Sequence, residues 1–347
     1  MRKAIIAIPT AAALLLLACG DDEGPVGTRE ISYWDIAYET SDTVITDIDM
    51  RSDKSGWATG YRPNAAAGAY DGLVYNYDGT AWRVAYFLPG ASGAKLLAVD
   101  FDADDDGWVI GMRYGEMNEP VILHYKGDAW VDAPTTGLNG GALSLLAAFS
   151  PTDVRVSDGT QSFHFNGTEW TAYPITEQGT VDRWCFPAPE IGWAVDSANG
   201  YCYRWNNAEK TWTMEPYPLY NLSAFYFTAD GAGIYADYEN APPVGDRANF
   251  YLRVASELPV YEKIFATNEG RLLSQCDYLA PDYFFFAGPN AAYEVNVDNV
   301  KPLNNVPAGD LGYLKALSIG VKGDVWGVMG PSYDFGPSFI VHKRARK

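Results

Sequence analysis

Histidine, cysteine and basic residues are scarce in this sequence, and these shortages narrow the range of functions. The chain of 347 residues has 3 His and 4 Cys, and its 25 Lys and Arg stand against 44 Asp and Glu, a formal net charge of −19. Nucleic-acid binding depends on clustered Lys and Arg, so we expect no nucleic-acid partner. The same charge disfavours direct binding to anionic lipid. The sequence has no G-x-S-x-G motif and no zinc-type cysteine spacing, and we identify no catalytic residue in it.

A long helical period is also missing, and only one long apolar run is present. It spans residues 4–18, about 15 residues, whereas a membrane-spanning helix needs about 20. Arg2 and Lys3 precede the run, as in a signal peptide. The run ends in Leu-Leu-Ala-Cys at Cys19, which resembles the lipobox of bacterial lipoproteins. An ordinary cleaved signal with an accidental cysteine is the alternative.

The lipobox resemblance implies a cellular location and a division of the chain into three parts. Residues 1–18 would be the signal peptide, Cys19 the lipidated N-terminus, and residues 19–28 a flexible tether without apolar periodicity. Residues 29–347 would form the folded domain. Two or more acyl chains hold a protein stably on a membrane. We therefore expect a lipid-anchored protein of the bacterial cell envelope, at the outer membrane or on the cell surface.

Tyr, Trp, Phe and Gly are abundant in the folded domain and recur in a repeat. Each copy has a short strand, often Gly-Trp and small residues, then a loop, an aromatic strand, a tight turn and a strand with Trp. The first four copies end at Trp82, Trp130, Trp170 and Trp212. Three weaker copies cover about residues 225–265, 276–306 and 317–347. The spacing of about 40–50 residues is typical of four-stranded propeller blades.

The repeat predicts an all-β fold, a seven-bladed β-propeller. One small sheet cannot bury both faces alone, but sheets arranged in a ring cover one another. The recurring Trp should fill the gaps between blades. The last copy ends without a Trp-bearing strand, and the domain begins with an unpaired strand that carries Trp34. We therefore predict that the N-terminal strand completes the last blade; six or eight blades are the alternatives.

The repeats resemble those of bacterial β-propellers of the Asp-box, kelch and photosystem-assembly-factor-like kind, over about residues 29–347. The Gly-Gly pair of kelch repeats is missing, and the segment from Asp78 to Trp82 is shorter than an Asp-box. The resemblance implies the architecture and assigns no function, because propellers serve many functions.

The remaining cysteines and the histidines are expected to be structural. Cys185, Cys202 and Cys276 are an odd number, so at least one thiol is free unless it pairs between chains. His124, His164 and His342 fall at the same place in three different copies, on third strands. Blades two, three and seven point in different directions, so these histidines should not converge on a metal or act together.

One turn resembles a calcium loop, although we expect no obligatory cofactor. Asp102, Asp104 and Asp106 precede Gly107 in a D-x-D-x-D-G pattern that could supply several oxygen ligands. The position of the bidentate Glu in an EF-hand holds Arg113 instead. A solvated turn between the first two strands of a blade is the alternative.

Long loops between second and third strands predict a binding surface. Insertions in a repeat fold collect on one face, often the binding face. Blades seven, one and two are neighbours in the expected ring, and blade five faces them. The candidate ligand-binding residues are Arg62, Tyr70, Arg113, Tyr114, Glu116, Tyr238, Glu239, Arg247, Tyr333 and Asp334. Tolerated surface variation is the alternative interpretation.

The sequence therefore favours a non-enzymatic binding or scaffold module that binds a protein or a glycan. Mixed Tyr, Arg and carboxylate side chains suit either partner. Two alternatives stay open: an extracellular carbohydrate-active hydrolase or lyase that uses carboxylates on the axial face, and a purely structural envelope protein.

Overall fold

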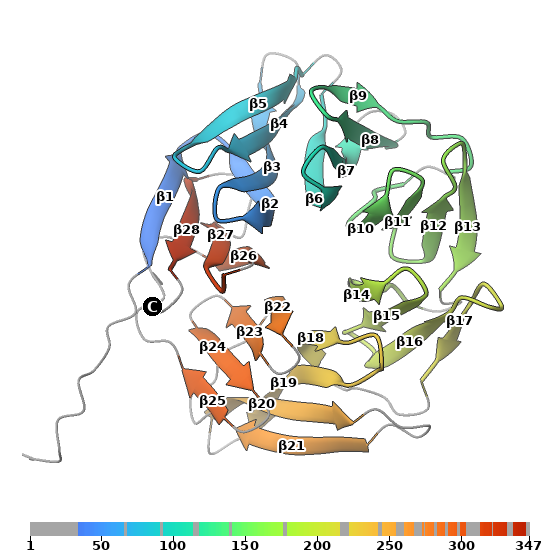
Figure 1. Cartoon of the computed structure of the whole chain (residues 1–347), viewed down its shortest axis with the longest axis vertical. Coiled ribbons are helices and arrows are strands. Elements are labelled where there is room, and N and C mark those ends of the chain that lie inside the picture. Colours follow the sequence, from blue (N-terminus) through green and yellow to red (C-terminus); the bar gives the residue numbers. More distant parts are fainter. Residues whose placement is uncertain are drawn as a thin grey trace, which may run out of the picture. The chain divides into compact units, whose positions relative to one another are not determined.

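The chain folds as a ring of seven four-stranded antiparallel sheets around a central axis (Figure 1). This computed structural model describes residues 34–344 except 66–67, 91–92, 114–117, 139–140, 176–178, 216–221, 242–244, 255–259, 267–272, 274, 281–282, 289–290, 297–298, 303–312, 321 and 332–335. In these residues every regular element is a strand, and none of them forms a helix able to cross a membrane. The protein is a seven-bladed β-propeller, as the repeat predicts, and not a six- or eight-bladed one.

Each blade contains four strands in chain order from the axis outward, with one exception. Blade one contains β2 (Val44–Ser52), β3 (Ser55–Asn64), β4 (Ala69–Tyr77) and β5 (Trp82–Leu88). Blade two contains β6 (Lys95–Ala103), β7 (Asp106–Arg113), β8 (Glu119–Lys126) and β9 (Trp130–Asp132). Blade three contains β10 (Leu145–Ser150), β11 (Asp153–Ser157), β12 (Gln161–Phe165) and β13 (Trp170–Pro174). Blade four contains β14 (Arg183–Ala188), β15 (Ile191–Asp196), β16 (Tyr201–Asn206) and β17 (Thr211–Met214).

The three weaker copies form the remaining blades. Blade five contains β18 (Leu222–Phe227), β19 (Gly233–Ala241), β20 (Gly245–Val254) and β21 (Val260–Ala266). Blade six contains β22 (Gln275–Ala280), β23 (Tyr283–Gly288), β24 (Ala291–Asn296) and β25 (Asn299–Pro302). Blade seven contains β26 (Tyr313–Ile319), β27 (Val325–Gly330), β28 (Ser338–Lys343) and, as its outer strand, β1 (Asp35–Thr40).

The ring is closed by pairing the first strand of the domain with the last. Strand β1 runs antiparallel to β28, with Tyr38 opposite Ile340. Trp34 packs edge-on against Phe285 of blade six at 6.1 Å, and Tyr38 packs against Tyr75 of blade one at 5.4 Å. The predicted closure is confirmed, and β1 contacts both neighbouring blades.

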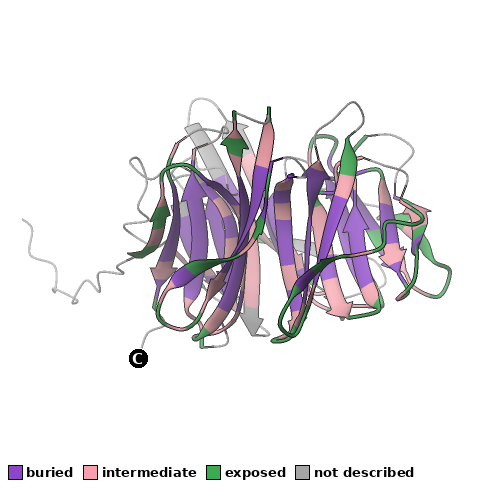
Figure 2. Cartoon of the chain, turned by 90° about the horizontal axis from the view of Figure 1, so that it is seen from above, coloured by how far each residue is buried: buried purple, intermediate pink, exposed green. Residues whose placement is uncertain are grey.

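The recurring Trp at the start of the outer strand packs against the preceding blade. Trp82 meets Trp326 of blade seven at 6.0 Å, Trp130 meets Trp57 of blade one at 5.5 Å, and Trp170 meets Trp108 of blade two at 6.5 Å. Trp82, Trp130 and Trp170 are all buried. These rings join apolar side chains of two blades into shared clusters. Burial is concentrated in the middle of the blades, and exposed residues follow their outer edges (Figure 2).

The degenerate copies replace these aromatic residues. By register, Tyr261 and Val300 occupy the position of the Trp in blades five and six. The aromatic residue opposite that Trp on the third strand, such as Tyr125, is replaced by Arg253 in blade five and by Lys343 in blade seven. Arg253 reaches Glu215 of blade four, and Lys343 reaches Glu294 of blade six at 2.7 Å. Buried ion pairs therefore join blades where aromatic packing is missing.

The two sides of the ring differ in what they carry. On one side the first strand of each blade begins and the hairpin between the second and third strands turns; Val44, for example, pairs with Tyr61. We call this side the entrance face. On the opposite side, β1 begins and β28 ends, since Asp35 pairs with His342. We call it the tether face, because the N-terminal segment joins the propeller there.

Candidate functional site: the entrance face

The entrance face has a central hollow of about 400 Å³, lined by the first strands of several blades and by residues just before them. It carries side chains of both charges in addition to apolar ones. Its polar and aromatic lining includes Thr46, Asp47, Ser144, Asp182, Arg183, Trp184, Gln275 and Lys315. No single blade supplies more than a few of these residues, so the hollow exists only because the ring closes.

Several lining side chains are held by hydrogen bonds across blade joints. Gln275 Nε2 donates to the carbonyl oxygen of Lys315 at 2.6 Å, and Trp184 Nε1 donates to that of Leu146 at 3.3 Å. The Arg183 guanidinium donates to the carbonyl oxygen of Ser223, and its Nε lies 3.5 Å from Asp182 Oδ2. These bonds fix the side chains before a ligand arrives, which lowers the entropic cost of binding.

Carboxyl groups on the first strands join neighbouring blades around the axis. Asp47, Asp49, Asp100 and Asp277 each accept a backbone N–H of the next blade's first strand, at 2.7–3.0 Å. Ser318 accepts the N–H of Met50 in the same way at 2.9 Å. A polar atom on a first strand thus joins blade six to seven, seven to one, one to two, and two to three.

Burial on the first strands raises the pKa of these aspartates. Desolvation disfavours the carboxylate form and raises the pKa of Asp47 to about 7 and that of Asp277 to about 6. For Asp49, desolvation raises the pKa to about 6, although Arg51 opposes the shift. The pKa of Asp100 is raised well above its usual value, chiefly by burial and also by Asp49. These first strands thus carry less negative charge near neutral pH than their sequence indicates.

These pKa values predict that the propeller is more stable at pH 5.5 than at pH 8. A carboxyl group whose pKa is higher in the folded state stabilises that state when protonated, and this contribution is lost as the pH rises from about 4 through about 7. His164 acts in the opposite direction. Burial lowers its pKa to about 3, so the folded state loses stability as the pH falls below about 6.5. The lowered pKa of His342 acts likewise.

These four aspartates, together with Asp102, whose pKa is also raised to about 6, oppose two histidines, so we expect the melting temperature to rise on acidification. Thermal unfolding of wild type and Asp47→Asn at both pH values tests this, because Asn keeps an oxygen for the Val99 N–H and does not titrate. The rise should be smaller in Asp47→Asn; an equal rise, or a fall in wild type, would contradict the assignment.

On the same face as the hollow, the predicted residues Arg62 and Tyr70 lie on the β3–β4 hairpin of blade one. Arg62 Nε is 2.9 Å from Asp71 Oδ2, and its guanidinium lies over Phe87 at 5.3 Å. Lys95 of blade two places its Nζ over the rings of Tyr61 and Tyr70, at 4.7 and 4.4 Å. Cation–π contacts of this kind hold the lysine between the two blades.

At Asp71, the hydrogen bonds together change the carboxyl pKa more than burial does. Burial would raise the Asp71 pKa, but Asn64, Arg62 and the Gly90 N–H lower it overall. The Arg62 pKa is raised, chiefly by its hydrogen bond to Asp71. This hairpin therefore presents an aromatic and charged surface whose side chains are held in place.

The other predicted binding residues are only partly described. Arg113, at the end of β7, lies 3.6 Å from Glu119. Tyr238 is half-buried on the long β19–β20 hairpin of blade five, where Glu239 and Arg247 are register partners. Tyr114, Glu116, Tyr333, Asp334 and the predicted lipidation residue Cys19 lie outside the described residues. The β3–β4, β7–β8 and β19–β20 hairpins all turn on the entrance face.

The predicted calcium turn lies on the tether face. Asp106 Oδ2 contacts His124 Nε2 at 2.9 Å, and Asp104 is exposed. Burial, together with the hydrogen bond and charge of Asp106, raises the pKa of Asp102 to about 6. A carboxylate held by a histidine is less available to a cation, and calcium binding here stays a prediction.

The histidines and cysteines lie as expected. His124 stacks on Trp108 and His342 on Trp326, each at 3.9 Å, and His164 contacts Trp205 at 4.6 Å. They belong to blades two, seven and three, so they do not converge. Cys185 and Cys202 are buried, Cys276 is half-buried, and all three thiols are free.

Comparisons with known proteins support the fold alone. No family model and no curated protein matches the chain. Among solved structures, it is similar to YCF48 bound to a D1 peptide, with a TM-score of 0.64 and 15% identity over 90% of this chain and 97% of that one. It is similar to virginiamycin B lyase from Staphylococcus aureus, with a TM-score of 0.62 and 12% identity over 90% and 100%. It also resembles the WD40 propeller domain of Doa1, with a TM-score of 0.60 and 10% identity over 91% and 98%.

Proposed function

We propose that this protein is a lipid-anchored β-propeller of the bacterial envelope that binds a protein or glycan partner on its entrance face. The observation that carries the proposal is that the entrance face carries both the central hollow and the contacts of the blade-one hairpin with Lys95, in which Arg62, Tyr61 and Tyr70 are held in place. Pre-positioned aromatic and cationic side chains around a polar depression are typical of binding surfaces. Structural neighbours include a propeller with a bound peptide and a WD40 domain, which is consistent with a binding role.

The anchor gives the proposal an orientation. With a lipid at Cys19, the tether would join the propeller where β1 begins, on the tether face. The entrance face would then point away from the membrane. The tether face also carries exposed acidic turns, including Asp104 and Asp105. Repulsion from anionic lipid would keep that face at a distance from the bilayer.

The proposal predicts that ligands selected on the full chain depend on the entrance face. The chain in detergent would be screened against a random-peptide display library and an array of bacterial envelope glycans. We expect a group of the selected ligands to lose at least tenfold in affinity with Lys315→Ser or with Arg62→Ala, since each substitution removes a cation of the entrance face. Lys54→Ala, an exposed lysine of the tether face, is the matched control and should bind like wild type.

If no selected ligand depends on either entrance-face residue, the assignment of this site is wrong. The same preparations test the anchor, because Cys19→Ala should move the protein from the membrane to the soluble fraction. They also test the rival function. Asp47 and Asp182 line the hollow, and one neighbour is a lyase. Turnover of polysaccharide or ester substrates that is lost in Asp47→Asn would favour a hydrolase or lyase.

A further inference from the structure

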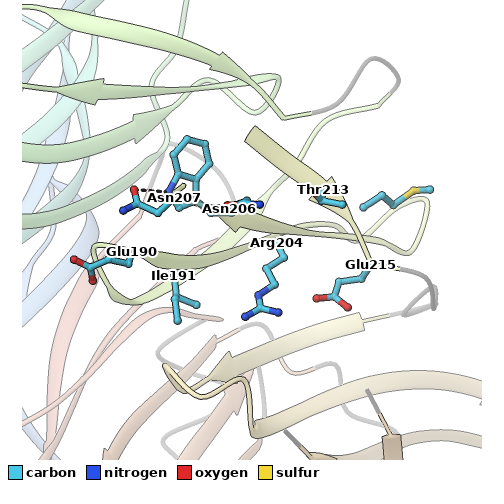
Figure 3. Close-up of a pocket in the computed structure, with 9 residues that line it drawn as sticks. Glu190, Ile191, Arg204, Asn206, Asn207, Thr213 and Glu215 are labelled. Atoms are coloured by element: carbon cyan, nitrogen blue, oxygen red, sulfur yellow. Dashed lines mark hydrogen bonds between the residues drawn. The ribbon is translucent and has the colours of Figure 1, made fainter. Parts of the chain in front are cut away.

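A cleft of about 490 Å³ opens on blade four, lined by the start of β15 and by β16 and β17, and it shares no lining residue with the central hollow. Arg204 on β16 extends into it between Ile191 and Glu215 (Figure 3). Met214, with 56% of its surface exposed, also lines it. The cleft therefore combines an exposed guanidinium with aliphatic walls.

Arg204 occupies the position in its blade that a histidine occupies in blades two and seven. In those two blades the histidine has an acidic partner on the neighbouring strand. In blade two, His124 is the cross-strand neighbour of Trp108 and contacts Asp106. In blade seven, His342 is the cross-strand neighbour of Trp326, and its Nε2 lies 3.7 Å from Asp324. In both blades the acid comes two residues before the Trp.

Blade four keeps this arrangement but lacks the acid. Arg204 is the cross-strand neighbour of Trp193 and lies over its ring at 5.8 Å, while Ile191 takes the place of the aspartate. Glu215 is already engaged by Arg253, with both side chains buried. In the part of the chain that the structure describes, the Arg204 guanidinium makes no hydrogen bond or ion pair.

The geometry points to a second binding site here, in which Arg204 takes the carboxylate of an Asp or Glu side chain from a partner polypeptide. A guanidinium binds a carboxylate through two parallel hydrogen bonds, and the contact with Trp193 helps to orient it. An aliphatic neighbour in the same peptide would pack on Ile191 and Met214. Glu190 also lines the cleft, and its negative charge disfavours a multiply charged anion such as phosphate.

The site is tested with random peptides displayed against the full chain in detergent. We expect enriched peptides to share an acidic residue beside an aliphatic one. Their affinity should fall at least tenfold with Arg204→Gln, or when the peptide acid is changed to its amide. Lys315→Ser, in the central hollow, should leave these affinities unchanged, which separates this site from the entrance face.

A substitution that rebuilds the internal acid gives the sharper test. Ile191→Asp would supply Arg204 with the partner found in blades two and seven, so peptide binding should be lost while the melting temperature stays at or above that of Ile191→Asn. Ile191→Asn has nearly the same shape as Ile191→Asp without the charge; it loses the aliphatic contact of Ile191 and should bind more weakly than wild type, but it leaves Arg204 open and should still bind. The assignment is overturned if no Arg204-dependent peptide is recovered, if amide peptides bind equally well, or if Ile191→Asp binds like Ile191→Asn.

Discussion

Deleting the segment that contains Trp34 and strand β1 should abolish the cooperative unfolding of the propeller or lower its free energy of unfolding by at least about 5 kcal/mol. Removing a buried aromatic side chain costs about 3–5 kcal/mol, and the deletion removes two half-buried ones, Trp34 and Tyr38, together with the β28 pairing. Domains of this kind have a total stability of about 5–15 kcal/mol. Urea unfolding of the wild-type and deleted chains measures the difference.

A permuted chain provides the control for this deletion. Because β28 ends next to the start of β1, a Gly-Asp-Ala turn copied from residues 127–129 can join Arg344 to Trp34 and turn the pair into an ordinary hairpin. The permuted protein, which begins at Thr43, should recover most of the lost stability. If the deleted chain unfolds like wild type, or if the permuted chain is no more stable than the deleted one, β1 does not close the ring as described.

The strong copies of the repeat could be predicted from the sequence because their signals are local. A Trp that follows a tight turn and an aromatic strand marks the outer strand whatever lies elsewhere in the chain. Trp34 was informative for the same reason, since it supplies the piece that the last copy lacks. The residue after it, Asp35, pairs with His342 of β28.

The joints of the degenerate copies could not be predicted in this way. Arg253 finds Glu215 at a sequence distance of 38, and Lys343 finds Glu294 at a distance of 49. Neither pair has a motif, and each forms only when two blades take their places in the ring. From the sequence alone, the charged residues of these joints would therefore be assigned to the surface, although the structure shows that their side chains are buried.

The residues of the candidate site could likewise be predicted only in part. The sequence indicates the blade-one hairpin by its unusually long loop, so Arg62 and Tyr70 could be predicted as candidate binding residues. The sequence does not indicate the central hollow, because the residues that line it come from different blades. Four of them, from four blades, are Asp47, Arg183, Gln275 and Lys315. Polar residues near the start of each otherwise apolar first strand were the available signal, and they carry meaning only once the strands are known to surround one axis.

Replacing Lys343 with Met should destabilise the propeller by about 3–5 kcal/mol, because it leaves the Glu294 carboxylate buried without its partner. The Lys343 and Glu294 side chains are 5% and 15% exposed, and their charged atoms lie 2.7 Å apart. Breaking a buried ion pair on one side costs about this much, whereas replacing both members by apolar residues is often neutral. Urea unfolding at pH 7 measures the loss.

Two further variants separate the buried pair from a general effect of removing charge. Lys343→Met combined with Glu294→Leu should recover most of the stability lost in the single variant, since no uncompensated charge remains. Lys322→Met breaks an ion pair with Asp53 on the exposed tether face and should leave the free energy of unfolding nearly unchanged. A double variant as unstable as Lys343→Met alone would show that packing of the lysine stem, rather than the unpaired carboxylate, accounts for the loss at the joint between blades six and seven.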